Sequence, residues 1–238
     1  MLILFLADKL TERHMTRSIA FIWLLLASSL DAGEIHSHVT ITPGLTKKRV
    51  TLPAYQLRCA LVKSPAQTST SVDELSRVAV YLEGPGLSVG KPLHLEMKQH
   101  NRQFEPDILL VPVGSAVSFP NADPIFHNVF SLSQAKAFDL GYYPLGQSRT
   151  LQFDKPGIAQ VYCHLHPNMT AGIVVVPSAW YGQPESDGNL VFSEVPTGDY
   201  KIVAWHRSAG FLGTRIHVPE NGSVDIELSL PLLDKKRE

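Results

Sequence analysis

The segment that decides both the fold and the site reads VYCHLHPNM and spans residues 161–169. It places a thiolate (Cys163), an imidazole (His166) and a thioether (Met169) at spacings of three and three. A second imidazole, His127, lies upstream in a strand-like apolar segment. Two imidazoles, one thiolate and a weak thioether are the donor set of blue-copper electron-transfer sites. The sequence therefore predicts one type 1 copper ion per chain, bound by His127, Cys163, His166 and Met169.

This mixture of donor types has a redox meaning. Copper(I) prefers soft sulfur ligands, whereas copper(II) prefers nitrogen donors in a tetragonal arrangement. A rigid scaffold that offers both kinds suits neither oxidation state fully, so little rearrangement is needed between the two states. Three donors come from one short segment, and a β-sheet at each end of that segment would hold their geometry.

The cysteines allow an alternative to copper. The chain has two of them, and an oxidising compartment would permit a disulfide between Cys59 and Cys163. We favour copper, because a disulfide does not account for the ligand pattern around Cys163. Cys59 is then expected to be a small buried core residue. Structural zinc rarely uses a thioether, and the Cys-x-x-Cys-His motif of c-type haem is absent.

Other histidines are not expected to bind a metal ion. His164 adjoins the cysteine, but at a strand end its side chain would point to the opposite face. His36 and His38 are expected to be solvated residues of a mobile terminus. His206 is either a surface residue or a contact with the copper domain, and both options stay open. An oxidase or nitrite reductase would need a second copper site with further histidines, so we expect a protein that is not an enzyme.

Composition indicates a folded all-β chain. Apolar residues make up 44% of the 238 residues, charged residues make up 18%, and the formal net charge is -1. With no long basic run, nothing indicates binding to nucleic acid. The 17 Pro and 16 Gly separate short Val/Ile/Leu runs, which is typical of strands and turns.

Residues 1–32 are predicted to be a signal peptide, with Met15 as the more natural start. Arg17 precedes the apolar run 19–27, and small residues follow it. The run is shorter than the roughly 18 residues that a membrane span needs. We therefore expect a periplasmic or secreted protein with no membrane span in the mature chain.

Residues 91–176 resemble a cupredoxin of the amicyanin and plastocyanin branch. The segments that carry the resemblance are FEP (104–106), VPVG (111–114), VSFPN (117–121), DPIFHNV (123–129) and the ligand segment 162–169. The last of these is similar to the short ligand loop of amicyanin. The resemblance implies a Greek-key β-sandwich in which the four residues named above bind copper.

The resemblance also implies two supporting residues. Asn128 matches the residue whose side chain ties the ligand loop to the neighbouring strand, although an Asn that only caps a turn stays open. Leu165 stands where the relatives usually have Pro, so its N–H can donate a second hydrogen bond to the thiolate and raise the reduction potential. The exposed edge of His166 would lie in an apolar patch, for which Pro124, Ile125, Pro167 and the apolar residues of 138–145 are available.

Residues 178–233 resemble the later half of a carboxypeptidase-regulatory or transthyretin-like β-sandwich. Their Gly-x-Tyr turn at 198–200 leads into a predicted core strand. So few strands cannot close a core alone. We expect residues 33–84 to supply its N-terminal strands, which gives a discontinuous Ig-like sandwich with the cupredoxin inserted. Two domains in series, with a poorly structured N-terminal arm, is the alternative.

The function expected by analogy is one-electron transfer between redox proteins, such as a c-type cytochrome or a periplasmic dehydrogenase. Copper binding and delivery is one alternative. A structural binding module with a cupredoxin fold is another. The sequence does not name the partners, the reduction potential or the oligomeric state.

Overall fold

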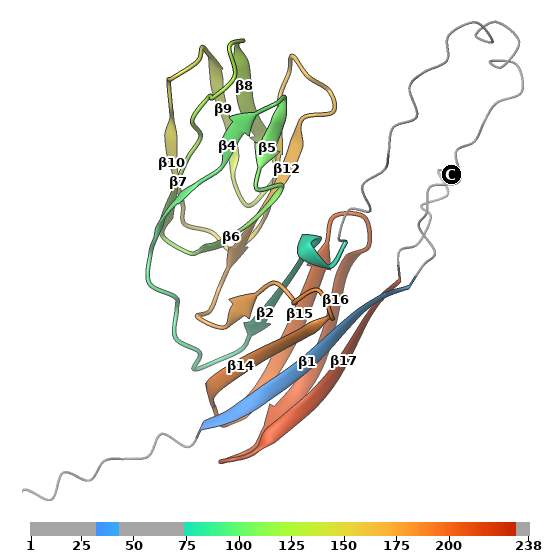
Figure 1. The fold of residues 1–238 in the computed structure, drawn as a ribbon. Coiled ribbons are helices and arrows are strands. Elements are labelled where there is room, and N and C mark those ends of the chain that lie inside the picture. Colours follow the sequence, from blue (N-terminus) through green and yellow to red (C-terminus); the bar gives the residue numbers. More distant parts are fainter. Residues whose placement is uncertain (1–31, 43–73, 232–238) are drawn as a thin grey trace, which may run out of the picture.

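The computed structural model describes residues 32–42 and 74–231 (Figure 1). Cys59 lies outside these ranges, as does the predicted signal peptide except for Ala32, which begins the first strand. The described residues form strands joined by turns and one short 3-10 helix, η1 (Leu75–Arg77). The all-β prediction is therefore confirmed. No helix in these ranges is long and apolar enough to cross a membrane.

The strands form two units, one above the other in Figure 1. The inserted sandwich contains β3 (His94–Glu96), β4 (Lys98–His100), β5 (Gln103–Glu105), β6 (Ile108–Pro112), β7 (Ser115–Ser118), β8 (His127–Leu132), β9 (Ala137–Tyr143), β10 (Thr150–Phe153), β11 (Gly157–Tyr162) and β12 (Thr170–Val176). The split sandwich contains β1 (Ala32–Thr42), β2 (Val78–Glu83), β13 (Tyr181–Gly182), β14 (Asn189–Pro196), β15 (Gly198–His206), β16 (Gly210–Val218) and β17 (Ser223–Pro231).

The inserted sandwich packs a five-stranded sheet, in the order β6-β12-β11-β8-β9, against a three-stranded sheet, β10-β7-β3. Strands β4 and β5 form a separate two-stranded hairpin. Parallel pairing of β12 with β6, beside antiparallel pairing with β11, requires a crossover of the chain. The buried side chains between these sheets form one core, which includes Phe119, Tyr143, Phe153, Cys163 and Met169.

The split sandwich combines strands from both sides of the insert. In one sheet β1 lies between β14 and β17, and in the other β2 lies between β13 and β15, with β16 at the edge. Figure 1 shows the blue β1 beside the orange and red C-terminal strands. Its transthyretin-like identity stays a prediction.

One expectation for the N-terminal residues was wrong. His36 and His38 belong to the regular strand β1, not to a mobile terminus. The strand alternates along its length, with Ile35 and Val39 buried and His36 on the exposed face. Nε2 of His36 lies 3.1 Å from Glu34, and Nδ1 of His38 lies 3.0 Å from the Asn189 side chain. Pairing on both edges orders this segment.

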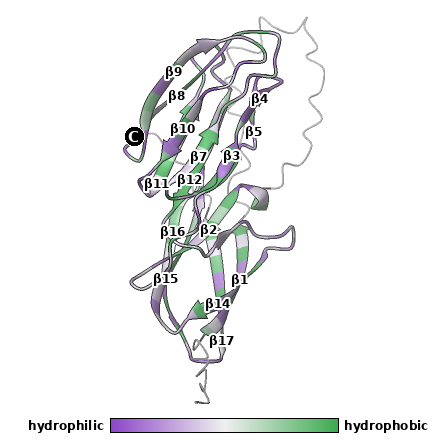
Figure 2. Ribbon diagram, turned by 90° about the vertical axis from the view of Figure 1, so that its left-hand side faces the viewer, coloured by the Kyte–Doolittle hydropathy of each residue, from purple (hydrophilic) through white to green (hydrophobic). Residues whose placement is uncertain are grey.

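An apolar junction joins the two units. Along β12, Ile173 and Val175 face the core of the inserted sandwich, whereas Val174 and Val176 face the junction. Such a strand is a continuous apolar run because both of its faces are buried. The buried junction residues are Ala79, Tyr81, Ile108, Val174, Val176, Val203 and Trp205. Figure 2 shows the hydrophobic stretches of both units lying mainly on the strands rather than on the connecting loops.

Candidate metal centre

The ligand segment is a tight loop between two paired strands. β11 ends at Tyr162 and β12 begins at Thr170, and these two residues pair across the base of the loop. Inside the loop, the Cys163 N–H donates to the Met169 carbonyl (3.2 Å), and the Met169 N–H donates to the His166 carbonyl (2.9 Å). These hydrogen bonds close residues 163–169 into a compact loop. One short loop therefore carries a thiol, an imidazole and a thioether.

The second imidazole belongs to the strand beside β11. His127 is the first residue of β8, which pairs with β11 at Phe130 and Tyr162 and with β9 at His127 and Tyr143. The sheet therefore brings His127 beside Cys163, although the two are 36 residues apart in the sequence.

The donor atoms surround a volume that suits one metal ion. Sγ of Cys163 lies 3.9 Å from Nδ1 of His127 and 3.7 Å from Nδ1 of His166. Metal–nitrogen and metal–sulfur bonds of about 2.0–2.3 Å place two donors of one ion about 3.6–3.8 Å apart at tetrahedral to trigonal angles. The donor atoms of these three residues all lie within 4.8 Å of one another. Among the described residues, this is the one group of His, Cys and carboxylate side chains with metal-binding geometry.

Met169 lies in the same core as the thiol. Its side chain is 1% exposed and belongs to the cluster of buried residues that contains Cys163. Cys163 is a free, buried cysteine in the structure. A thioether, a thiol and two imidazoles are thus present together, as the sequence predicts, and this is the combination that suits copper rather than structural zinc.

The two histidines differ in exposure. His127 is fully buried, whereas His166 is only partly buried and reaches the surface of the loop. Desolvation lowers the pKa of His166, the nearby His127 and Arg102 lower it further, and the carboxylate of Asp123 offsets part of this. A neutral imidazole is the form that binds a metal ion. The surroundings of His166 therefore favour its ligand form.

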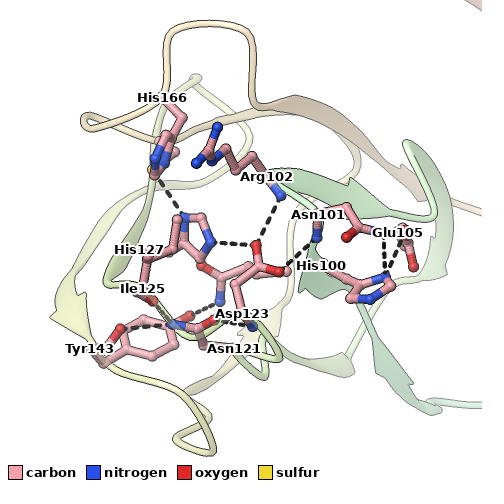
Figure 3. A network of polar contacts seen from close by, with 12 residues as sticks. His100, Asn101, Arg102, Glu105, Asn121, Asp123, Ile125, His127, Tyr143 and His166 are labelled. Atoms are coloured by element: carbon pink, nitrogen blue, oxygen red, sulfur yellow. Dashed lines mark hydrogen bonds and ion pairs between the residues drawn. The ribbon is translucent and has the colours of Figure 1, made fainter.

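A carboxylate supports the buried histidine. Nε2 of His127 lies 2.8 Å from Oδ2 of Asp123 (Figure 3). Burial alone would raise the pKa of Asp123, but hydrogen bonds from the Arg102 N–H, from His127 and from the Asn101 N–H lower it overall. The Asp123 N–H in turn donates to Oδ1 of Asn121 (2.9 Å). The sequence alone assigns no role to Asp123, whose one signal is a carboxylate four residues before His127.

Asn128 has a different partner from the one expected. Its side-chain amide donates to Oδ1 of Asp139 on β9 (2.6 Å), and the same oxygen accepts the Gly141 N–H (2.8 Å). Oδ1 of Asn128 is buried and has no hydrogen-bond partner among the described residues. Asn128 thus ties β8 to β9 rather than to the ligand loop, because Asp139 offers a charged acceptor within reach.

Leu165 lies on the exposed part of the ligand loop. Its side chain is 49% exposed. Sγ of Cys163 lies within contact range of the rings of His127 and His166. The N–H···S hydrogen bond from Leu165 stays a prediction.

Two further histidines lie where they cannot complete this site. The ring of His164 stacks on Phe130, with centroids 3.9 Å apart, on the outside of the sheet. His206 is 1% exposed, and its Nε2 lies 3.1 Å from Glu74. The option of a surface position for His206 was therefore wrong.

Several of the residues that the sequence offers for an apolar patch near His166 are exposed, whereas the patch itself stays a prediction. Pro124 and Pro167 are exposed, and Tyr142 and Leu145 are 52% and 56% exposed. Tyr143, in contrast, is fully buried; its hydroxyl donates to the Phe119 carbonyl (2.7 Å). Phe126, the residue before His127, is a further exposed aromatic side chain (55%).

No protein-family model and no curated protein sequence matches the chain. Solved structures similar to part of it include a purple cupredoxin from Nitrosopumilus maritimus, 24% identical over 34% of this chain and 98% of that chain, with a TM-score of 0.32. A reduced amicyanin variant is 22% identical over 40% of this chain and 98% of that chain (TM-score 0.32).

A copper-containing nitrite reductase from Thermus scotoductus is 25% identical over 39% of this chain and 24% of that chain (TM-score 0.34). TM-scores of this size carry no conclusion about function, which therefore depends on the residues of this chain. Those residues form a β-sandwich that holds a His-Cys-His-Met side-chain cluster.

Proposed function

We propose that this chain is an exported type 1 copper protein that transfers single electrons between redox partners. The observation that carries the proposal is the buried Cys163 thiol facing two imidazole Nδ1 atoms, at 3.9 and 3.7 Å, in the core that also holds Met169. A copper ion bound by these four side chains would supply a one-electron Cu(II)/Cu(I) couple.

The scaffold supports electron transfer because it holds the donors in place before any metal binds. His127 is immobilised by β8 and its bond to Asp123, and the loop is closed by the two backbone hydrogen bonds at Met169. Donors that move little between oxidation states keep the reorganisation cost low. The same burial of His127 and Met169 disfavours a delivery role, because a chelator cannot reach either side chain.

Access for electrons is proposed at the exposed side of His166. Exposed apolar side chains of the same and neighbouring segments, such as Leu165 in the ligand loop and Phe126 beside His127, would offer a desolvated contact for a protein partner. A c-type cytochrome or a periplasmic dehydrogenase is the proposed kind of partner, in keeping with a periplasmic or secreted location. We propose no catalytic role, since the metal centre has only one group of ligands among the described residues.

The test is a titration of the purified protein with copper(II), followed by visible and EPR spectroscopy. One equivalent of copper should give an intense thiolate-to-copper band and a narrow hyperfine splitting. Cys163→Ala should lose both signals, whereas the matched loop variant His164→Ala should keep them. A colourless wild-type protein, or a disulfide between Cys59 and Cys163 found by mass spectrometry, would overturn the proposal.

Voltammetry separates the possible roles of a bound copper ion. A reversible couple with fast electron self-exchange supports electron transfer. Rapid loss of copper to a chelator, together with slow self-exchange, would indicate delivery instead. Turnover of nitrite by the copper-loaded protein would contradict the proposal that the chain is not an enzyme.

A further inference from the structure

Asp123 is a buried carboxylate that contacts the buried ring of His127. The side chain of Asp123 is 8% exposed and that of His127 is 0% exposed, and they meet at 2.8 Å. Burying an ionised carboxylate is costly unless each of its oxygens is hydrogen-bonded. Three donors meet this requirement, and one of them is the ring of a residue in the candidate metal centre.

Two of the three donors belong to the hairpin β4-β5. The Asn101 N–H donates to Oδ1 of Asp123 (2.7 Å), and the Arg102 N–H donates to Oδ2 (2.9 Å). Asn101 and Arg102 have φ angles of 53° and 57°, the left-handed backbone of a tight two-residue hairpin turn. This conformation points two successive N–H groups at one carboxylate. Figure 3 shows Asp123 between this turn and the ring of His127.

The backbone of Asp123 is held as well. Its N–H donates to Asn121, whose side-chain amide donates to the carbonyls of Ile125 (2.8 Å) and Tyr143 (3.0 Å). The carboxylate is therefore fixed from three sides before it meets the imidazole. A carboxylate held in this way determines the position of the ring.

The contact determines which ring nitrogen of His127 carries the proton. A carboxylate can only accept a hydrogen bond, so Nε2 must donate to Asp123. In the neutral ring, Nδ1 then has a free lone pair, and Nδ1 is the atom that faces Sγ of Cys163. The hydrogen bond also makes the imidazole a stronger donor to a metal ion.

We propose that Asp123 is a positioning residue of the metal centre, which fixes the tautomer and orientation of His127 and tunes its strength as a donor. The inference rests on the proposed copper site. A stronger imidazole donor favours copper(II) over copper(I), so Asp123 lowers the reduction potential. The hairpin turn at Asn101 and Arg102 thereby becomes part of the site's support.

The test compares Asp123→Asn with Glu105→Gln. Glu105 is a matched control because it lies on the hairpin whose turn contacts Asp123. Its carboxylate also contacts a histidine, His100 (3.2 Å), away from the candidate site. Asp123→Asn should weaken copper(II) binding about 10- to 100-fold, the usual cost of removing such a supporting residue. Each tenfold decrease in the affinity for copper(II), relative to the affinity for copper(I), raises the reduction potential by about 59 mV. Glu105→Gln should change neither quantity.

A second measurement needs no variant and no copper. Long-range ¹⁵N–¹H spectra of the metal-free wild-type protein, at a pH where the ring is neutral, should show His127 with its proton on Nε2. This readout remains available if Asp123→Asn does not fold.

The outcomes separate the two proposals. If the wild type binds copper, but Asp123→Asn retains its affinity and potential or His127 carries its proton on Nδ1, the inference about Asp123 is wrong and the proposed function stands. If the wild type binds no copper, both proposals are overturned.

Discussion

Arg207 of the split sandwich donates a 2.9 Å hydrogen bond from Nη1 to Oγ1 of Thr170, the first residue of β12. Thr170 follows Met169 directly and pairs with Tyr162 at the base of the ligand loop. A second contact between the units joins Nε of Arg77 to Asp107 at 2.8 Å. The split sandwich is therefore attached at the strand that ends the ligand loop.

Thr170→Val should destabilise the protein by about 1–2 kcal/mol, because the substitution keeps the shape of the side chain but leaves a hydrogen-bond donor of Arg207 unpaired. The other terminal nitrogen of Arg207 is already buried without a partner among the described residues. The free energy of unfolding from chemical denaturation checks this. Thr150→Val, which removes an exposed hydroxyl contact with Ser118, is the control, and an equal loss in both variants would contradict the prediction.

Gly172→Ala should weaken the junction by about 1–3 kcal/mol through overpacking. A Cβ at this position would lie 2.8 Å from Cη2 of Trp205 and 3.1 Å from Cδ1 of Ile108. Chemical denaturation measures the loss. Trp205→Phe removes the atom in closest contact, so the double variant should lose less than the sum of the two single variants. Strict additivity would show that Trp205 does not clash with the added methyl group.

Stability should fall with decreasing pH in the window below about pH 6.5, in part because of His206. Desolvation lowers the pKa of this buried ring, and the neighbouring Glu74 offsets part of that effect. Since the unfolded state binds the proton more readily, stability is complete above the unfolded pKa. It is lost as the pH falls from there toward the lower folded pKa.

Denaturation curves recorded across this window check the contribution of His206. His206→Gln should flatten the dependence of stability on pH. Glu74→Gln removes a group that raises the pKa of His206, so it should steepen the dependence. Identical slopes in the wild type and His206→Gln would rule out the contribution.

Short-range features of the site could be predicted from the sequence because chain connectivity alone sets them. Cys163, His166 and Met169 lie within seven residues, and a loop between two paired strands has few ways to close. Their grouping follows from their spacing. The all-β fold was predictable for a similar reason, since Gly and Pro separate short apolar runs throughout the chain.

Contacts across the sheets could not be predicted, because they depend on strand order and register. The partner of Asn128 is Asp139 because β9 lies beside β8, and Asp123 meets His127 because the β4-β5 turn supplies two N–H groups to the same carboxylate. The histidines of β1 are ordered by pairing with β17, a strand from the C-terminal part of the chain.

The sequence by itself thus determined the all-β class and the donor set, with three of the four donors placed by local spacing. Only the tertiary structure decided that His127 joins them at Nδ1, that Asp123 holds it, and that β12 serves two cores at once. The physical reason is that spacing along a short loop restricts distances directly. The approach of residues 36 apart depends instead on which strands the whole core selects as neighbours.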